Sequence, residues 1–370
     1  MTTEKTRWLS LDAARGFAMF WIIGADALIL ALRDASPSPF WRAFAAQMEH
    51  SAWHGLRFYD LIFPIFMFVA GLGAGLFTPS LDGVAQPERR ARYARALRRF
   101  ALLVALGIVY NHGWGTGMPL ALDQIRYASV LGRIGFAWLV TTLLVWHCAW
   151  RTRALAAGLI LAGYYLLQCW FPVPGVGAGV LTPEGSLNTY IDHHFLPGIT
   201  YRHRPYDPEG LFSDLSAVFN CLSGALVARY LVARPERSAA MILIGIGGVG
   251  ILAAWLWNLG YPINKELWTA SFALASSAIA CVLFGLVHGL SGLRAGRAAL
   301  LPFVVIGSNA LPIYLSTSLM DWSFVSRSLF GGMAARVEAP WQPVVIATGV
   351  LAIELVVLTW MYRRRLFLKI

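Results

Sequence analysis

The chain has 370 residues, of which 58% are hydrophobic and 13% are charged, and its mean hydropathy is +0.60. These values exclude an ordinary soluble domain, in which about a quarter of the residues are charged. They predict a multi-pass membrane protein. The formal net charge of +11 does not indicate a nucleic-acid partner, because the arginines stand in short clusters between apolar segments, as topology signals do.

Long apolar segments recur along the whole chain and predict an all-α, polytopic transmembrane helical bundle. About 20 apolar residues in a helix cross a hydrocarbon core of about 30 Å. Nothing indicates a second, soluble domain, so residues 1–370 are expected to form a single transmembrane domain. About ten spans are predicted, over residues 11–32, 58–77, 97–114, 129–150, 154–171, 211–232, 239–258, 269–290, 300–319 and 342–361.

The basic residues predict the orientation of these spans. Most of them lie in one set of short loops and at the two ends of the chain, so the positive-inside rule makes both termini cytoplasmic. The opposite loops include 33–57, 172–210 and 320–341, which hold Pro, Gly, Asp, Asn, His and Trp residues. Substrate recognition is therefore expected on the extracytoplasmic face.

Three other patterns have simpler explanations than the chemistry they suggest. The GxGxxG sequence at 245–250 lies inside an apolar span with no strand before it, so it indicates close helix packing and not a dinucleotide site. The four cysteines lack a CxxC spacing and are interpreted as core residues. The histidines of the 172–210 loop fit no closed zinc module, so no metal is expected.

Ionisable side chains at the edge of an apolar span are candidates for function. His50 precedes the span that begins near Asp60, and Asp26 lies at a similar depth on the first span. A histidine can take a proton at neutral pH when a carboxylate fixes its other ring nitrogen. Either Asp60 or Asp26 could supply that carboxylate. Asp12 and Arg15 lie three residues apart on one helix face and are expected to pair.

Several short motifs resemble one enzyme family when they are taken in order and spacing. They are residues 7–16 (RWLSLDAARG), 50–55 (HSAWHG), 59–64 (YDLIFP), 130–133 (VLGR), 207–210 (DPEG) and 262–268 (PINKELW). Together they resemble the heparan-α-glucosaminide N-acetyltransferase family, and the matches extend from residue 7 to the C-terminus. In this resemblance His50 matches the family's catalytic histidine, and Asp26 stands where the human member has an asparagine.

The resemblance implies a transmembrane acetyltransferase that takes acetyl from cytosolic acetyl-CoA and delivers it to the amino group of a terminal glucosamine on the far side. His50 would be a general base or a transient acetyl carrier. Arg15, Arg98 and Arg99 are the expected phosphate partners of acetyl-CoA, because arginine matches phosphate oxygens with a bidentate fork. The short N-terminus and Ala/Arg-rich composition favour a bacterial inner membrane.

The expected partners are an amino-sugar or glycan acceptor and membrane lipid, and the oligomeric state is left open, a homodimer included. Two alternatives also stay open, namely a proton-coupled sugar or glycolipid transporter and an enzyme that O-acetylates a cell-envelope polysaccharide. The residues expected to contact the acceptor or the oxyanion are Trp53, Asp192, Asp207, Glu209, Asn264, Lys265, Trp268 and Asn309.

Overall fold

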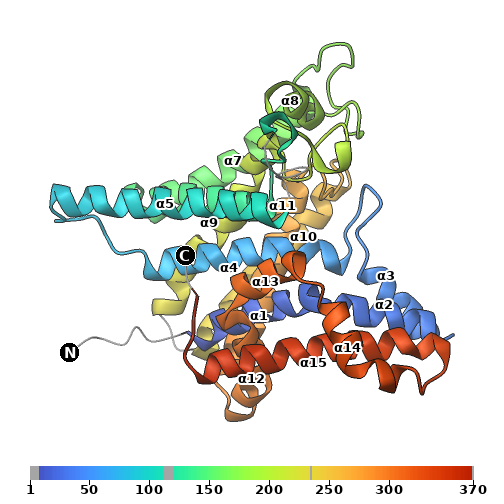
Figure 1. The fold of residues 1–370 in the computed structure, drawn as a ribbon. Coiled ribbons are helices and arrows are strands. Elements are labelled where there is room, and N and C mark those ends of the chain that lie inside the picture. The colour runs from blue at the N-terminus through green and yellow to red at the C-terminus, as the bar shows by residue number, and fades with distance from the viewer. Residues whose placement is uncertain (1–7, 112–120, 234–235, 369–370) are drawn as a thin grey trace.

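A computed structural model describes residues 8–111, 121–233 and 236–368, and these residues form α-helices with short 3₁₀ and π turns (Figure 1). The α-helices are α1 Leu9–Phe20, α2 Asp26–Ala35, α3 Pro39–Gln47, α4 Ile62–Phe77, α5 Gln86–Tyr110, α6 Val130–His147, α7 Trp150–Trp170, α8 Leu187–Phe195, α9 Leu211–Ala233, α10 Glu236–Asn258, α11 Ala270–Ser291, α12 Arg294–Ser308, α13 Ala310–Leu319, α14 Trp322–Ala334 and α15 Gln342–Arg363.

The all-helical class is confirmed, and each of the ten expected spans overlaps a helix. Among the described residues, seven helices are long and apolar enough to cross a membrane, and the bent pair α12–α13 would make an eighth. The expected span at 97–114 is helical in α5 as far as Tyr110, and its residues 112–114 lie outside the described residues. The span at 154–171 is helical in α7, but neither helix is among the seven. In α5 the reason is a first half rich in arginine, so its apolar stretch begins only at Phe100. The count of ten spans and the cytoplasmic termini stay predictions.

Three helices lie in segments that the sequence analysis treats as outer loops. They are α3, α8 and α14, and α14 packs along α15. The two ends of the described chain come together: Leu9 at the start of α1 and Tyr362 near the end of α15 pack against the same apolar cluster.

Two of the candidate spans are broken. The first changes direction at Gly24, whose φ of 130° lies in the region that side chains rarely adopt, and a π-helical turn Trp21–Ala25 separates α1 from α2. The helices α12 and α13 meet at Asn309 with a bend of 62°. Pairs of broken helices are not evident from the sequence, and only the structure shows these two breaks.

The helix α4 lies at the centre of the bundle and packs against α9, α6, α1 and α11. Gly71 permits the close approach to α9, because a Cβ there would lie 1.7 Å from the carbonyl oxygen of Cys221. The GxGxxG segment also serves helix packing, since Gly247 faces the Ala278 backbone of α11 at a distance that leaves no room for a Cβ. A central, closely packed α4 provides a rigid wall for the site described next.

Candidate active site

His50 and Asp60 pair at the start of the span that contains α4, and the side chain of His50 is 46% exposed whereas that of Asp60 is buried. The Nδ1 atom of His50 lies 2.7 Å from Oδ1 of Asp60, and Asp60 is 0% exposed. The other carboxylate oxygen of Asp60 accepts hydrogen bonds from the backbone N–H groups of Ser51 and Arg57, at 3.3 and 3.0 Å. Three donors thus fix the carboxylate, and the carboxylate fixes the ring so that Nε2 is the nitrogen available for proton transfer.

Lys265 approaches the same imidazole from the turn between α10 and α11. Its Nζ lies 2.9 Å from Nδ1 and 3.1 Å from Nε2 of His50, and 3.7 Å from Oδ1 of Asp60. Burial lowers the pKa of Lys265 from its ordinary value, and the negative charge of Asp60 opposes that shift. The site therefore holds a base, an anion and a hydrogen-bond donor within one cluster.

Backbone and side-chain contacts hold the two loops of this cluster together. The N–H of Gly55 donates to the carbonyl of Ile263 at 2.8 Å, and the amide of Asn264 lies 3.3 Å from Nδ1 of His54. Gly55 adopts a φ of 118°, which only glycine adopts readily, so this position explains the glycine that ends the 50–55 motif.

Asp26 joins the cluster through a tyrosine. The hydroxyl of Tyr59 donates to Oδ2 of Asp26 at 2.9 Å, and the Tyr59 ring lies 5.1 Å from the His50 ring. Of the two carboxylates expected beside His50, Asp60 makes the direct contact. Asp26 approaches His50 only indirectly, through Tyr59.

A cavity of about 1690 Å³ connects this cluster to the far end of α4. His50, Tyr59 and Lys265 line one end, and both Ile62 and Phe77 line the wall. These two residues are the first and last of α4, so the cavity follows about 22 Å of helix at 1.5 Å per residue. A passage of this length covers most of a hydrocarbon core of about 30 Å.

The other end of the cavity is rich in arginine. Its lining includes the three residues expected to bind phosphate, together with two neighbours on α5: Arg15, Arg92, Arg95, Arg98 and Arg99. The Asp12–Arg15 ion pair is confirmed at 3.3 Å, and Gly73 of α4 lies beside Arg15, where an added Cβ would lie 3.5 Å from Nη2. The Arg99 guanidinium lies 4.1 Å from the centre of the Trp138 ring.

Buried donors without partners lie near this arginine end. Nε of Arg99, the Thr142 hydroxyl and the Trp146 indole nitrogen have no hydrogen-bond partner in the part of the chain that the structure describes. All three residues line the cavity. Because buried donors are normally satisfied, the wall fits a ligand with several acceptor oxygens.

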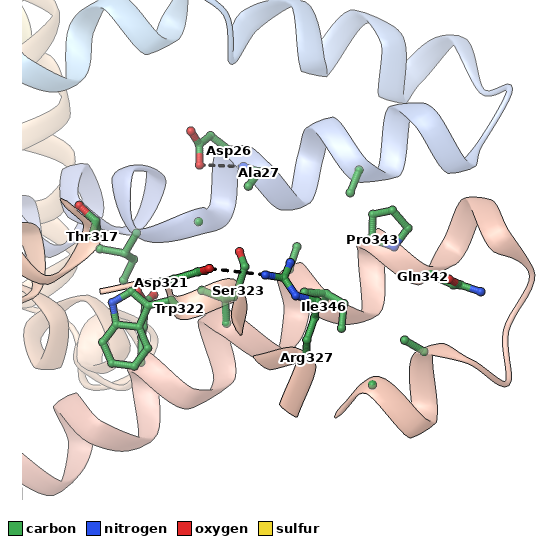
Figure 2. Close-up of a pocket in the computed structure, with 18 of the residues that line it drawn as sticks. Asp26, Ala27, Thr317, Asp321, Trp322, Ser323, Arg327, Gln342, Pro343 and Ile346 are labelled. Atoms are coloured by element: carbon green, nitrogen blue, oxygen red, sulfur yellow. Dashed lines mark hydrogen bonds and ion pairs between the residues drawn. The ribbon is translucent and has the colours of Figure 1, made fainter. Parts of the chain in front are cut away.

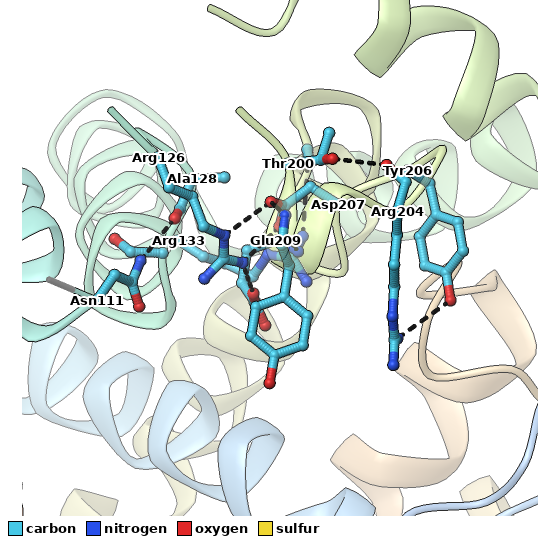
Figure 3. Close-up of polar contacts among 12 residues, drawn as sticks. Asn111, Arg126, Ala128, Arg133, Thr200, Arg204, Tyr206, Asp207 and Glu209 are labelled. Atoms are coloured by element: carbon cyan, nitrogen blue, oxygen red, sulfur yellow. Dashed lines mark hydrogen bonds and ion pairs between the residues drawn. The ribbon is translucent and has the colours of Figure 1, made fainter. Parts of the chain in front are cut away.

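A buried ionic network supports the lip of the cavity beside His50 (Figure 3). Arg126 bridges Asp207, with contacts of 2.6 and 2.8 Å, and Glu209 at 2.6 Å. Burial disfavours the charge of Arg126, but the two carboxylates raise its pKa above the ordinary value. Glu209 lines the cavity, whereas Asp207 accepts the backbone N–H of Tyr201 and lies behind it.

Comparisons with known proteins agree with the sequence motifs. The chain is 25% identical to the human heparan-alpha-glucosaminide N-acetyltransferase over 98% of its length, and 24% identical to the mouse protein of that name over 87%. These relatives support the heparan-α-glucosaminide N-acetyltransferase family. The chain spans 60% of the human protein's length and 56% of the mouse protein's. No family model matches the chain.

Several residues expected to bind the acceptor of such an acetyltransferase have structural contacts instead. Trp53 donates its indole N–H to the carbonyl of Leu181 at 2.8 Å, and thereby ties the 50–55 motif to the 172–210 loop. Trp268 is 1% exposed and donates to Asn220 at 2.9 Å, so the expectation of a sugar platform at this residue is wrong.

Three further expected contacts, Asn264, Asn309 and Asp192, are also held inside the fold. Asn264 is 0% exposed and accepts the N–H of Leu267 at 2.8 Å. Asn309 bonds the backbone of Leu366 and Leu368 near the C-terminus, so it does not lie beside His50 as an oxyanion donor. Asp192 is buried and accepts two backbone N–H groups. Of the expected acceptor contacts, only Glu209 and Lys265 line the cavity.

Several residues that shape the site are not among those expected from the sequence. Tyr59 belongs to the 59–64 motif and Arg126 precedes the 130–133 motif, and both are polar residues that could partner Asp26 and Asp207. Thr142 and Trp146 carry no such signal, because they lie in an apolar span and only the fold shows that they line the cavity.

Proposed function

We propose that this protein is a transmembrane acetyltransferase that moves acetyl from cytosolic acetyl-CoA to the amino group of a glucosamine-type sugar outside the cytoplasm. The observation that carries the proposal is the cavity with His50 and Lys265 at one end and five arginines at the other. Arg15, Arg98 and Arg99 would hold the phosphates of acetyl-CoA, while its thin acyl-bearing arm extends along α4 towards His50.

The chemistry assigned to His50 is general-base catalysis. The amine nitrogen bonds to the thioester carbonyl carbon and the carbon–sulfur bond breaks. Nε2 of His50 takes the proton that leaves the nitrogen and passes it to the thiolate. Asp60 keeps a proton on Nδ1, and this leaves the lone pair on Nε2. Attack by Nε2 on the thioester, with a transient acetyl-imidazole, uses the same geometry and stays open.

Lys265 would stabilise the negative charge that develops on the carbonyl oxygen. Its ammonium lies 3.1 Å from Nε2, so it can donate to an oxygen on a group that is bound against that nitrogen. One preorganised donor of this kind contributes about 10²–10³ to the rate in acyl transfer. The same ammonium also contacts Asp60, which keeps it in place before substrate binds.

Sealed membrane vesicles test the proposal. Labelled acetyl-CoA is supplied on the side of the arginine clusters and glucosamine on the other, and the product is analysed as N-acetylglucosamine. The wild type should form the amide, and His50→Ala, inserted to the same level, should lose about 10²–10⁴ of the rate. Undiminished transfer by His50→Ala would remove this residue from the chemistry, and an ester product would identify O-acetylation.

A second candidate function is favoured by the two broken spans. Discontinuous helices form substrate and ion sites in secondary transporters, and here the breaks lie at Gly24 and Asn309. A proton-coupled sugar transporter would move glucosamine across the membrane of proteoliposomes that contain no thioester. If glucosamine crosses the membrane without acetyl-CoA, as fast as acetylation proceeds with it, transport is favoured. If glucosamine crosses only when acetyl-CoA is present, the acetyltransferase is favoured.

A further inference from the structure

A second cavity, of about 1110 Å³, lies between α2, α14 and α15. Figure 2 shows Asp26 and Ala27 on the wall formed by α2, and Asp321, Trp322 and Arg327 on the wall formed by α14. The proposed acetyl transfer uses none of these residues, although Asp26 contacts Tyr59 beside His50. The cavity is therefore a feature of the fold that the proposed reaction leaves unexplained.

Glu354 of α15 lines this cavity and lacks a counter-ion. Its side chain is 0% exposed, and neither carboxylate oxygen has a hydrogen-bond partner within residues 8–111, 121–233 and 236–368. The other acidic groups in the lining do have partners: Asp26 accepts from Tyr59 at 2.9 Å, and Asp321 pairs with Arg327 at 3.5 Å. Ionising a buried carboxyl group that has no partner costs several kcal/mol, and a cation beside it would offset that cost.

The lining favours an organic cation over a metal ion. The described residues contain no group of three or more His, Cys, Asp or Glu side chains that could hold a metal. The volume lies slightly above the usual range of small-molecule pockets, about 300–1,000 Å³. Trp322 adds an aromatic ring to the wall, and aromatic rings attract ammonium groups.

We propose that this cavity binds an organic ammonium ion, with the carboxylate of Glu354 as its counter-ion. The ammonium group belongs either to a small soluble amine or to the headgroup of an aminophospholipid. Both sources present the same charge and the same N–H donors to Glu354. Binding needs no thioester, so this inference can hold or fail independently of the proposed acetyl transfer.

Binding of ethanolamine to the purified protein, measured by calorimetry without acetyl-CoA, tests the site. Ethylene glycol is the neutral comparison. The wild type should bind ethanolamine saturably and ethylene glycol at least about tenfold more weakly, because only the ammonium pairs with a buried charge. Glu354→Gln keeps the shape of the side chain and should lose about tenfold or more in ethanolamine affinity.

Two further variants make the result specific. Glu338→Gln removes the same charge from the exposed turn before α15 and should bind as the wild type does. Ala347→Phe leaves Glu354 in place but fills part of the cavity, and should also lose binding. Equal ethanolamine affinity in the wild type and in a folded Glu354→Gln or Ala347→Phe protein would overturn the proposal, as would the absence of saturable binding to the wild type.

Nanodiscs distinguish the two sources of the ammonium group. If the ligand is a lipid headgroup, phosphatidylethanolamine discs should weaken the apparent affinity for added ethanolamine relative to phosphatidylglycerol discs. If the ligand is a soluble amine, the two kinds of disc should give the same affinity. Either outcome supports an ammonium site at Glu354.

Discussion

The two ends of the larger cavity are built in opposite ways. At the end with His50, Asp60 lies within 4 Å of both His50 and Lys265, and it receives three hydrogen bonds. At the arginine end, buried donors of Arg99, Thr142 and Trp146 have no partner among the described residues. Charged side chains that hold one another in place are suited to catalysis, and a wall whose hydrogen-bond donors lack partners is suited to binding a ligand. Substitutions at the first end should lower kcat, and substitutions at the second should raise KM for acetyl-CoA.

The largest expected effect within this comparison comes from Asp60→Asn. The backbone N–H groups of Ser51 and Arg57 would hold the amide oxygen, so the NH₂ group would face Nδ1 and donate to it. The proton of the neutral imidazole would then lie on Nε2, which is the wrong tautomer, while the side chain keeps its size. We expect kcat to fall by about 10²–10⁴ with little change in KM for acetyl-CoA. Steady-state kinetics of acetylglucosamine formation measures both constants.

Glu49→Gln is the matched control for Asp60→Asn. Glu49 lies next to His50 but is half-exposed, and it pairs with Arg33 and Arg57 instead of with the ring. Its kcat should stay within about twofold of wild type, because exposed pairs contribute only about 0–1 kcal/mol. Equal losses in the two variants would mean that the loop as a whole matters and the tautomer does not.

Lys265→Met should have the next largest effect. It removes the ammonium beside Nε2 and keeps the length of the side chain, so we expect kcat to fall by about 10²–10³. Lys265→Arg retains a donor and should recover part of the rate. A Met variant with wild-type kcat and a higher KM for the sugar would instead assign Lys265 to acceptor binding.

The sequence alone predicts the charged residues at the two ends of the cavity better than the contacts of the acceptor, for a physical reason. His50, Asp60 and Lys265 belong to short polar motifs at helix ends, where a charged residue is conspicuous beside apolar spans. Trp268 and Asn309 look similar in sequence, yet burial and backbone contacts occupy both. Whether a polar side chain faces a cavity or a neighbouring backbone depends on helix rotation and loop conformation, and sequence spacing does not fix these.

Arg99→Gln tests the binding end and should change a different constant. It removes a guanidinium from the arginine end of the cavity wall, at the end opposite His50 and Lys265, so kcat should change little. We expect KM for acetyl-CoA to rise about tenfold, the value of one hydrogen bond to a charged group. Arg90→Gln is the control, since Arg90 is exposed on the same helix and does not line the cavity. A lower kcat at unchanged KM in Arg99→Gln would contradict the division between the two ends.

The smallest expected effect concerns stability at the lip of the cavity, where Asp192 underlies the Arg126 network. Burial raises the pKa of Asp192 to about 7, against an ordinary value near 3.8, although two backbone N–H groups partly oppose the shift. The folded state then binds a proton that the unfolded state has already lost between these two values. The stabilising contribution of this group is therefore complete below about pH 4 and is lost as pH rises through 7.

Thermal unfolding should show the Tm of wild type falling relative to Asp192→Asn, by on the order of a few degrees, between pH 5 and pH 8. A constant difference over that range would mean that Asp192 stays ionised in the fold, and acetyl-transfer kinetics should change little in either case because this carboxylate does not line the cavity.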